Sequence, residues 1–130
     1  MLKKIDHFGL AAYCALIFWL SNQQTLPTPE LFENQDKVHH LLAYFGMGLM
    51  CWRSFRHWIS APIILAIASI AFCSLYGISD EWHQTFVPGR NASVLDWVAD
   101  TLGAILAQLG LLKYASNQQI TLSKSHFTNL

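Results

Sequence analysis

Four apolar stretches, separated by short polar segments, make up most of the chain. They run from about Ile5 to Leu20, Val38 to Trp52, Ala61 to Ser79 and Val94 to Leu112. Each is roughly 15 to 20 residues long, close to the length that a helix needs to cross the hydrocarbon core of a bilayer. A helix of a soluble bundle needs a charged face, and the third stretch contains no charged residue. The pattern therefore predicts membrane-spanning helices.

The fold class that follows is all-α: a polytopic membrane protein built as a four-transmembrane-helix bundle. One transmembrane domain over residues 1–115 accommodates the four stretches, because 130 residues leave room for only one domain. Residues 116–130 are polar and lack apolar periodicity, so we expect them to form a frayed C-terminal tail.

Composition supports a membrane location and excludes two other classes. Apolar residues make up 53% of the chain and charged residues 12%, and the formal net charge is zero. A disordered chain has low hydrophobicity and high net charge, and a nucleic-acid-binding surface needs an excess of Lys and Arg. Neither feature is present, so we expect membrane lipids and no nucleic acid as partners.

The positions of the cations predict the topology. Six of the eight flank one side of the predicted spans, namely Lys3, Lys4, Arg53, Arg56, Lys113 and Lys124, and only Lys37 and Arg90 lie on the other. Positive residues are enriched in cytoplasmic loops. Both termini are therefore expected in the cytoplasm, in a multi-pass protein of the cytoplasmic (inner) membrane.

Carboxylates gather toward the predicted outer ends of the last three spans. Seven of the eight acids lie there or in the outer loops: Glu30, Glu33, Asp36, Asp80, Glu81, Asp96 and Asp100. Asp36, His40 and Tyr44 recur every four residues, which places them on one helical face. Because isolated charges at this depth are costly, we expect the polar side chains of three helices to converge.

Small residues continue these faces into the apolar part of the helices. In the third stretch a small and polar face is formed by Ala66, Ser69, Cys73, Gly77, Asp80, Glu81 and Gln84. In the fourth, Gly103 and Ala107 form a pair of small residues four apart, a spacing that permits close approach of helix backbones.

Asp96 and Asp100 differ in what they imply. Ser93 and Asp96 have the spacing of a capping box, so Asp96 has two interpretations: it satisfies the helix N-terminus with Arg90 as its counter-ion, or it belongs to a site. Asp100 lies one turn deeper, where a charge must face a partner, be protonated or line a wet cavity.

Three motifs follow one another between Ser21 and Ala107. They are Asp36-Lys37-x-x-His40-x-x-x-Tyr44, Asp80-Glu81-x-His83-Gln84-x-Phe86-Val87-Pro88-Gly89-Arg90 and Ser93-x-x-Asp96-x-x-x-Asp100-x-x-Gly103. Together they closely resemble the VanZ-like family of small bacterial membrane proteins. The resemblance implies four transmembrane helices and an association with resistance to the glycopeptide teicoplanin, and it implies no particular reaction. The family usually has Asn where this chain has Asp100.

The predicted cluster is open to several functions. In the first hypothesis it binds an envelope lipid headgroup or a peptidoglycan precursor, with Arg90 and Lys37 as anion contacts and Tyr44, Trp82 and Phe86 as walls. The candidate ligand-binding residues are Asp36, Lys37, His40, Tyr44, Asp80, Glu81, His83, Gln84, Arg90, Asp96 and Asp100.

The alternatives use the same residues differently. A metal-dependent enzyme acting on a lipid-linked phosphate would take its oxygen ligands from Asp36, Asp80, Glu81 and Asp96, with His40 or His83 as ligand or base. No metalloprotease or phosphatase signature establishes such a metal site, and no cofactor is expected. A purely structural network, in which the polar groups satisfy one another, is the third reading. Ion or proton translocation has little support, because the inner halves of the spans offer few polar groups.

Overall fold

The part of the chain that the structure describes folds mainly into helices. The computed structural model describes residues 1–24 and 33–128, with side chains to residue 119. These ranges form α1 (Leu2–Ser21), α2 (Gln35–Phe55), α3 (Pro62–Gln84) and α4 (Val94–Thr128), and they contain no strand. The predicted all-α class is confirmed.

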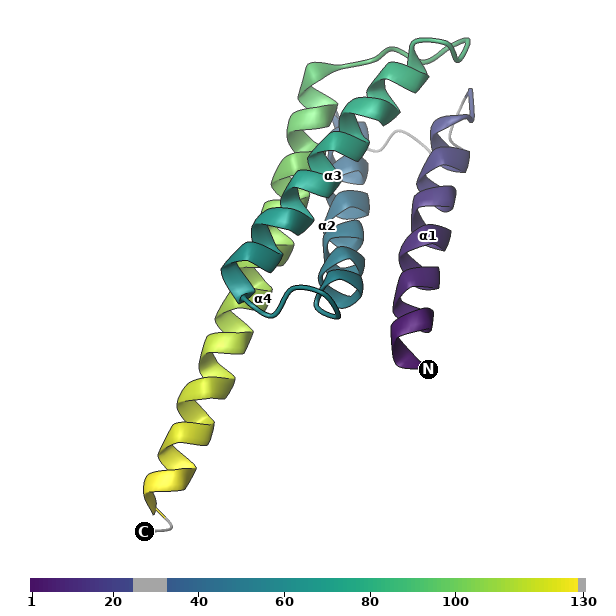
Figure 1. Ribbon diagram of the computed structural model, residues 1–130. Coiled ribbons are helices and arrows are strands. Elements are labelled where there is room, and N and C mark those ends of the chain that lie inside the picture. The colour runs from purple at the N-terminus through teal and green to yellow at the C-terminus, as the bar shows by residue number, and fades with distance from the viewer. Residues whose placement is uncertain (25–32, 129–130) are drawn as a thin grey trace.

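Helices α2, α3 and α4 lie together, and α1 stands to one side of them (Figure 1). α1 ends, α2 begins, α3 ends and α4 begins at the same end of the bundle, which we call the loop end. The N-terminus and residues 56–61 lie at the opposite end, and α4 extends past that end toward the C-terminus (Figure 1).

Glycines let α2 and α4 pack backbone to backbone. A Cβ at Gly103 would lie 2.9 Å from the backbone nitrogen of Phe45, and one at Gly48 would lie 3.3 Å from Cα of Ala104. Ala104 and Ala107 are at most 1% exposed. The close approach predicted from Gly103 and Ala107 is present, and it holds the first turns of α4 against the side chains at the start of α2.

Helix α3 buries the face that its sequence predicts. Its buried residues are Leu65, Ala66, Ser69, Cys73, Gly77, Asp80, Glu81 and Gln84. The remaining surface is apolar and exposed, as at Ile63 (67%), Ile67 (61%) and Leu75 (67%). Such extensive exposed apolar surface is unusual for a soluble monomer and suits contact with lipid tails.

Two of the helices in the described part of the chain are long and apolar enough to cross a membrane. They are α3 and the segment of α4 from Val94 to Gln119. The helices run past several of the predicted bounds: α2 extends from Gln35 to Phe55 rather than from residue 38 to 52. Helix α4 continues to Thr128, past residue 115, where the sequence predicted the start of a frayed tail. No Gly or Pro follows Gly110 to end the helix.

An ion-pair group at the other end of the bundle joins α1 to α2. Asp6 is 5% exposed. One of its carboxylate oxygens accepts hydrogen bonds from Nε and a terminal nitrogen of Arg53 at 3.1 and 2.8 Å, and the other lies 2.8 Å from Nε2 of His57. Near the middle of α1, Tyr76 donates to the Cys14 carbonyl at 2.7 Å. These contacts anchor α1 away from the loop end.

Candidate functional site

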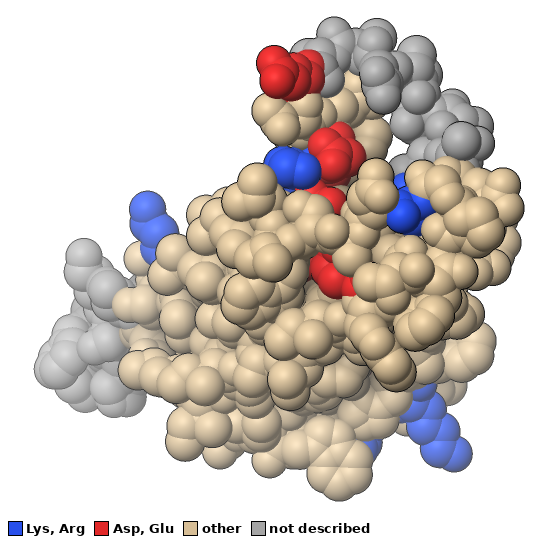
Figure 2. Space-filling view, turned by 90° about the horizontal axis from the view of Figure 1, so that it is seen from above, with Lys and Arg blue, Asp and Glu red and all other residues tan. Residues whose placement is uncertain are grey.

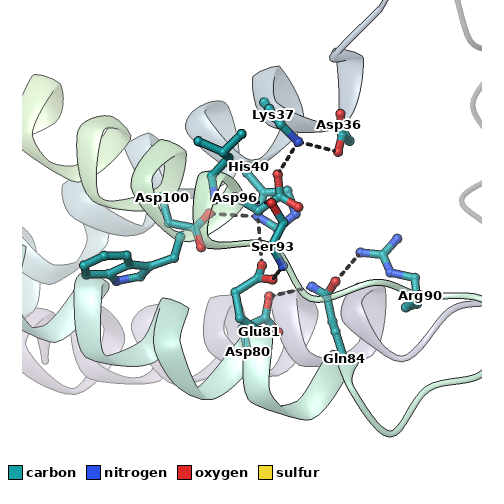
Figure 3. Close-up of polar contacts among 12 residues, drawn as sticks. Asp36, Lys37, His40, Asp80, Glu81, Gln84, Arg90, Ser93, Asp96 and Asp100 are labelled. Carbon is teal, nitrogen blue, oxygen red and sulfur yellow. Dashed lines mark hydrogen bonds and ion pairs between the residues drawn. The ribbon is translucent and has the colours of Figure 1, made fainter.

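Acidic and basic side chains meet at the loop end. Seen from above that end, Asp and Glu side chains gather in the middle of an otherwise mostly uncharged face, with Lys or Arg beside them (Figure 2). The close-up shows side chains from α2, α3, α4 and the α3–α4 connection turned toward one another (Figure 3). We call this group the polar cluster, and it consists of Asp36, Lys37, His40, Asp80, Glu81, Gln84, Arg90, Ser93, Asp96 and Asp100.

Lys37 connects the start of α2 with the start of α4. Its Nζ lies 2.8 Å from Oδ1 of Asp96 and 3.0 Å from Oδ2 of Asp36. The Asp96 side chain is only 7% exposed, whereas that of Asp36 is 60% exposed. The hydrogen bonds to Asp96 and Asp36 hold the pKa of Lys37 above its usual value. Lys37 is therefore a permanent counter-ion for a buried acid.

His40 and Asp100 form a second link between the same helices. Nδ1 of His40 lies 2.9 Å from Oδ1 of Asp100, whose side chain is fully buried. The other oxygen of Asp100 has no hydrogen-bond partner among the described residues. It fits against α3 because position 77 is glycine: a Cβ there would lie 2.9 Å from it.

Glu81 of α3 holds the backbone that leads into α4. Its Oε2 accepts the backbone N–H of Ser93 at 2.7 Å, and the Ser93 hydroxyl accepts the N–H of Leu95 at 3.2 Å. Ser93 thus caps α4 as its sequence predicts. The reciprocal half of the capping box expected from Asp96 is instead made by Glu81, so Asp96 is left to pair with Lys37.

Arg90 has no carboxylate partner within 4.0 Å among the described residues. A terminal nitrogen of Arg90 donates a hydrogen bond to Oε1 of Gln84 at 3.1 Å, and Gln84 in turn donates to Oδ2 of Asp80 at 3.3 Å. Of the two interpretations of Asp96, the one in which Arg90 is its counter-ion does not hold, since Lys37 takes that position. A guanidinium has five N–H donors, so most of those of Arg90 remain available to a ligand.

A cavity of about 340 Å³ opens beside the polar cluster, between α1 and the helices α2 and α3. Three buried polar atoms of its lining residues make no well-formed hydrogen bond in the described part of the chain, although the Ser21 hydroxyl lies beside the Asp80 carboxylate: they are Oγ of Ser21, Oη of Tyr44 and Oδ1 of Asp80. Arg90 also lines this cavity. The full lining is Ile17, Leu20, Ser21, Asp36, His39, His40, Ala43, Tyr44, Asp80, Gln84 and Arg90.

One predicted site residue turns away from this cavity. Nε2 of His83 lies 3.3 Å from Oδ1 of Asn22, and its ring packs on Phe18 with the centroids 4.6 Å apart. His83 lines a separate hollow of about 440 Å³ together with Trp82 and Phe86, which were expected to be walls of the same site. The position of His83 on α3 directs it toward α1.

The cavity also includes residues that sequence reasoning did not single out. Ser21 is the last residue of α1, and its only signal is a hydroxyl at the end of an apolar run. His39 lies next to His40 and lines the cavity.

The predicted metal ligands do not come together as one set. Glu81 and Asp96 are joined by His40 in a group whose possible ligand atoms all lie within 4.8 Å of one another. Asp36 and Asp80 are not part of that group.

Comparison with known protein families gives a match. The family model described as VanZ/LLP1 matches residues 11–114, a range that includes the whole polar cluster. No curated protein and no solved structure matches the chain significantly.

Proposed function

Because the chain belongs to the VanZ/LLP1 family, we propose that it is a multi-pass protein of the cytoplasmic membrane whose cavity binds a phosphate-bearing group of the envelope. That group is a lipid headgroup or a lipid-linked cell-wall precursor, which share an anionic phosphate on an apolar tail. The cavity carries both kinds of surface: most of its lining is apolar, and polar atoms stand at one wall.

The observation that carries the proposal is the set of unsatisfied polar groups around the cavity. A buried hydroxyl or carboxylate oxygen without a partner costs about 1 to 3 kcal/mol, so native proteins leave few of them. Here Ser21, Tyr44 and Asp80, which all line the cavity, each hold one such buried atom, and the Ser21 hydroxyl lies beside the Asp80 carboxylate. A self-contained structural network would pair these atoms internally, whereas a bound ligand with donors and acceptors can pair with them once these side chains turn toward the cavity.

Arg90 supplies the anion contact. A guanidinium offers five N–H donors in a planar fork that matches two oxygens of a phosphate. Arg90 uses one terminal nitrogen on a neutral amide and stands at the cavity wall. Lys37, the other anion contact expected from the sequence, is held by two carboxylates.

In the proposed topology, the chain crosses the membrane four times and both termini lie in the cytoplasm. α3 and α4 have the length and composition for this, and the exposed leucines and isoleucines of α3 suit lipid. The six-to-two division of cations supports the orientation. The loop end, with the cavity, then faces the outside of the cytoplasmic membrane.

Cysteine labelling tests this topology. A cysteine at Asn91, which is exposed in the α3–α4 connection, is expected to react with a membrane-impermeant maleimide added to intact spheroplasts. A cysteine at Lys4 is expected to react only after the cells are opened. The unmodified chain is the control, because Cys51 and Cys73 are buried and Cys14 is partly buried. Labelling of Asn91→Cys only in opened cells would place the loop end in the cytoplasm and contradict the proposed orientation.

Binding is tested with the purified protein in a non-ionic detergent. Phosphatidylglycerol and a polyprenyl phosphate serve as the two probes, and phosphatidylcholine as the comparison. One of the two anionic probes is expected to bind saturably. Arg90→Gln is expected to lower the affinity for that probe by about 10- to 100-fold, the loss expected for a charged bidentate contact. Native mass spectrometry or a shift in unfolding temperature measures this.

The matched control is Arg56→Gln, which removes the same charge at the other end of the bundle, where Arg56 lies 3.8 Å from Asp6. Equal weakening by both variants would mean that binding follows net charge and would overturn the proposal. Expression of the chain in a teicoplanin-sensitive bacterium extends the test to glycopeptide tolerance: the proposal expects a higher teicoplanin concentration to be needed to stop growth, and Arg90→Gln to remove that increase.

A further inference from the structure

We propose that His40, Glu81 and Asp96 form a site for a divalent cation that accepts mixed imidazole and carboxylate ligands, such as Zn²⁺ or Mn²⁺. Each residue comes from a different helix, α2, α3 and α4. One possible ligand atom from each lies within 4.8 Å of the other two. A shift of about 1 Å brings such atoms to the separation found around a metal with bonds of about 2.0 to 2.2 Å.

The second observation is a buried carboxylate oxygen directed into this group. Glu81 is 8% exposed, and its Oε1 has no hydrogen-bond partner among the described residues. The other oxygen, Oε2, is fixed by the backbone N–H of Ser93 at 2.7 Å. This contact turns Oε1 toward His40, 3.9 Å from Nδ1 (Figure 3). A bound cation would satisfy an atom that the described protein groups leave unpaired.

Charge balance also favours a cation here. The polar cluster holds five carboxylates and only two permanent cations, Lys37 and Arg90 (Figure 3). With all five carboxylates ionised and His40 neutral, the form that ligates metals, three negative charges would be in excess. Uncompensated charge in a partly buried cluster is costly, and a divalent cation removes most of the excess.

Each proposed ligand is held in place by a further contact. Asp100 lies 2.9 Å from Nδ1 of His40, the carboxylate–imidazole pairing that commonly orients a metal-binding histidine, so Nε2 is the nitrogen left to bind the ion. Ser93 holds Glu81, and Lys37 holds Asp96 at 2.8 Å. Imidazole together with carboxylates suits Zn²⁺ or Mn²⁺ better than Ca²⁺, which prefers six to eight oxygens.

Calorimetric titration of the protein tests the site, after treatment with EDTA and without a polyhistidine tag, in phosphate-free buffer and non-ionic detergent. Zn²⁺ and Mn²⁺ are titrated, with Ca²⁺ as the comparison. We expect saturable binding of one ion per chain. Glu81→Gln or His40→Gln is expected to weaken the affinity for the ion by at least about tenfold. Asp36→Asn, which removes an exposed acid of the same cluster, is expected to change the affinity by less than about twofold.

Two outcomes would overturn the proposal: no saturable binding of either ion, or equal weakening by Glu81→Gln and Asp36→Asn, which would show diffuse attraction to acids. Circular dichroism of the ion-free variants checks that they fold, and His40→Gln gives an independent result if Glu81→Gln does not. The cation site can be tested independently of phosphate binding. Arg90→Gln is expected to bind the ion with the affinity of the unmodified protein.

Discussion

Lys37→Gln is expected to destabilise the protein by about 3 kcal/mol, because it leaves Asp96 buried without its counter-ion. The Asp96 carboxylate is 7% exposed and lies 2.8 Å from the ammonium. Arg90, the other permanent cation of the polar cluster, contacts the Gln84 amide rather than Asp96, so it does not supply the missing charge. Equilibrium unfolding in mixed detergent micelles measures the loss.

The double variant Lys37→Gln/Asp96→Asn is expected to recover much of this stability, because it removes the unpaired charge along with its partner. Arg90→Gln is the comparison and is expected to cost less than about 1 kcal/mol, since it loses one hydrogen bond to a neutral amide. A loss at Arg90 as large as that at Lys37 would make Arg90 an internal counter-ion and would favour the purely structural reading of the cluster.

Gly103→Ala is expected to destabilise the protein by about 3 kcal/mol, the upper part of the usual range for overpacking a core. The added Cβ would meet the backbone of α2, at the carbonyl of Leu41 and the nitrogen of Phe45. A backbone cannot move aside as a side-chain end can, so the helices must separate. That separation also moves Asp96 and Asp100 away from Lys37 and His40, and we expect ligand binding to weaken together with stability.

Gly110→Ala provides a matched control on the same helix. No atom lies within 4 Å of a Cβ at position 110. Alanine is favoured over glycine in helices by about 0.5 to 1 kcal/mol, so this variant is expected to be neutral or stabilising. If Gly103→Ala were equally well tolerated, the close contact of α2 with α4 would be wrong.

Much of the helix packing can be predicted from spacing alone. The small and polar face of α3, from Ala66 to Gln84, is buried as its periodicity indicates, and Gly103 and Ala107 lie at a close helix contact. These predictions succeed because residues three or four apart share a helical face whatever the tertiary fold. The same rule brings Asp36, His40 and the acids of α3 and α4 to one end of the bundle.

Pairings within the cluster could not be predicted in the same way. Arg90 is six residues from Asp96 in the sequence, yet Lys37, on another helix, is the residue that pairs with it. The choice depends on the crossing of α2 over α4, which spacing within one helix does not specify. The same holds for Glu81, which displaces Asp96 from the capping of α4, and for His83, which faces α1.

A high-resolution experimental structure of the protein extracted with its native lipids tests the central claim most directly. The account predicts density for a phosphate group within about 3 Å of the Arg90 guanidinium, with an apolar tail in the cavity between α1 and the helices α2 and α3. Arg90 paired with Asp80 or Asp36, with α1 closed over an empty cavity and Ser21 and Tyr44 hydrogen-bonded within the protein, would contradict it.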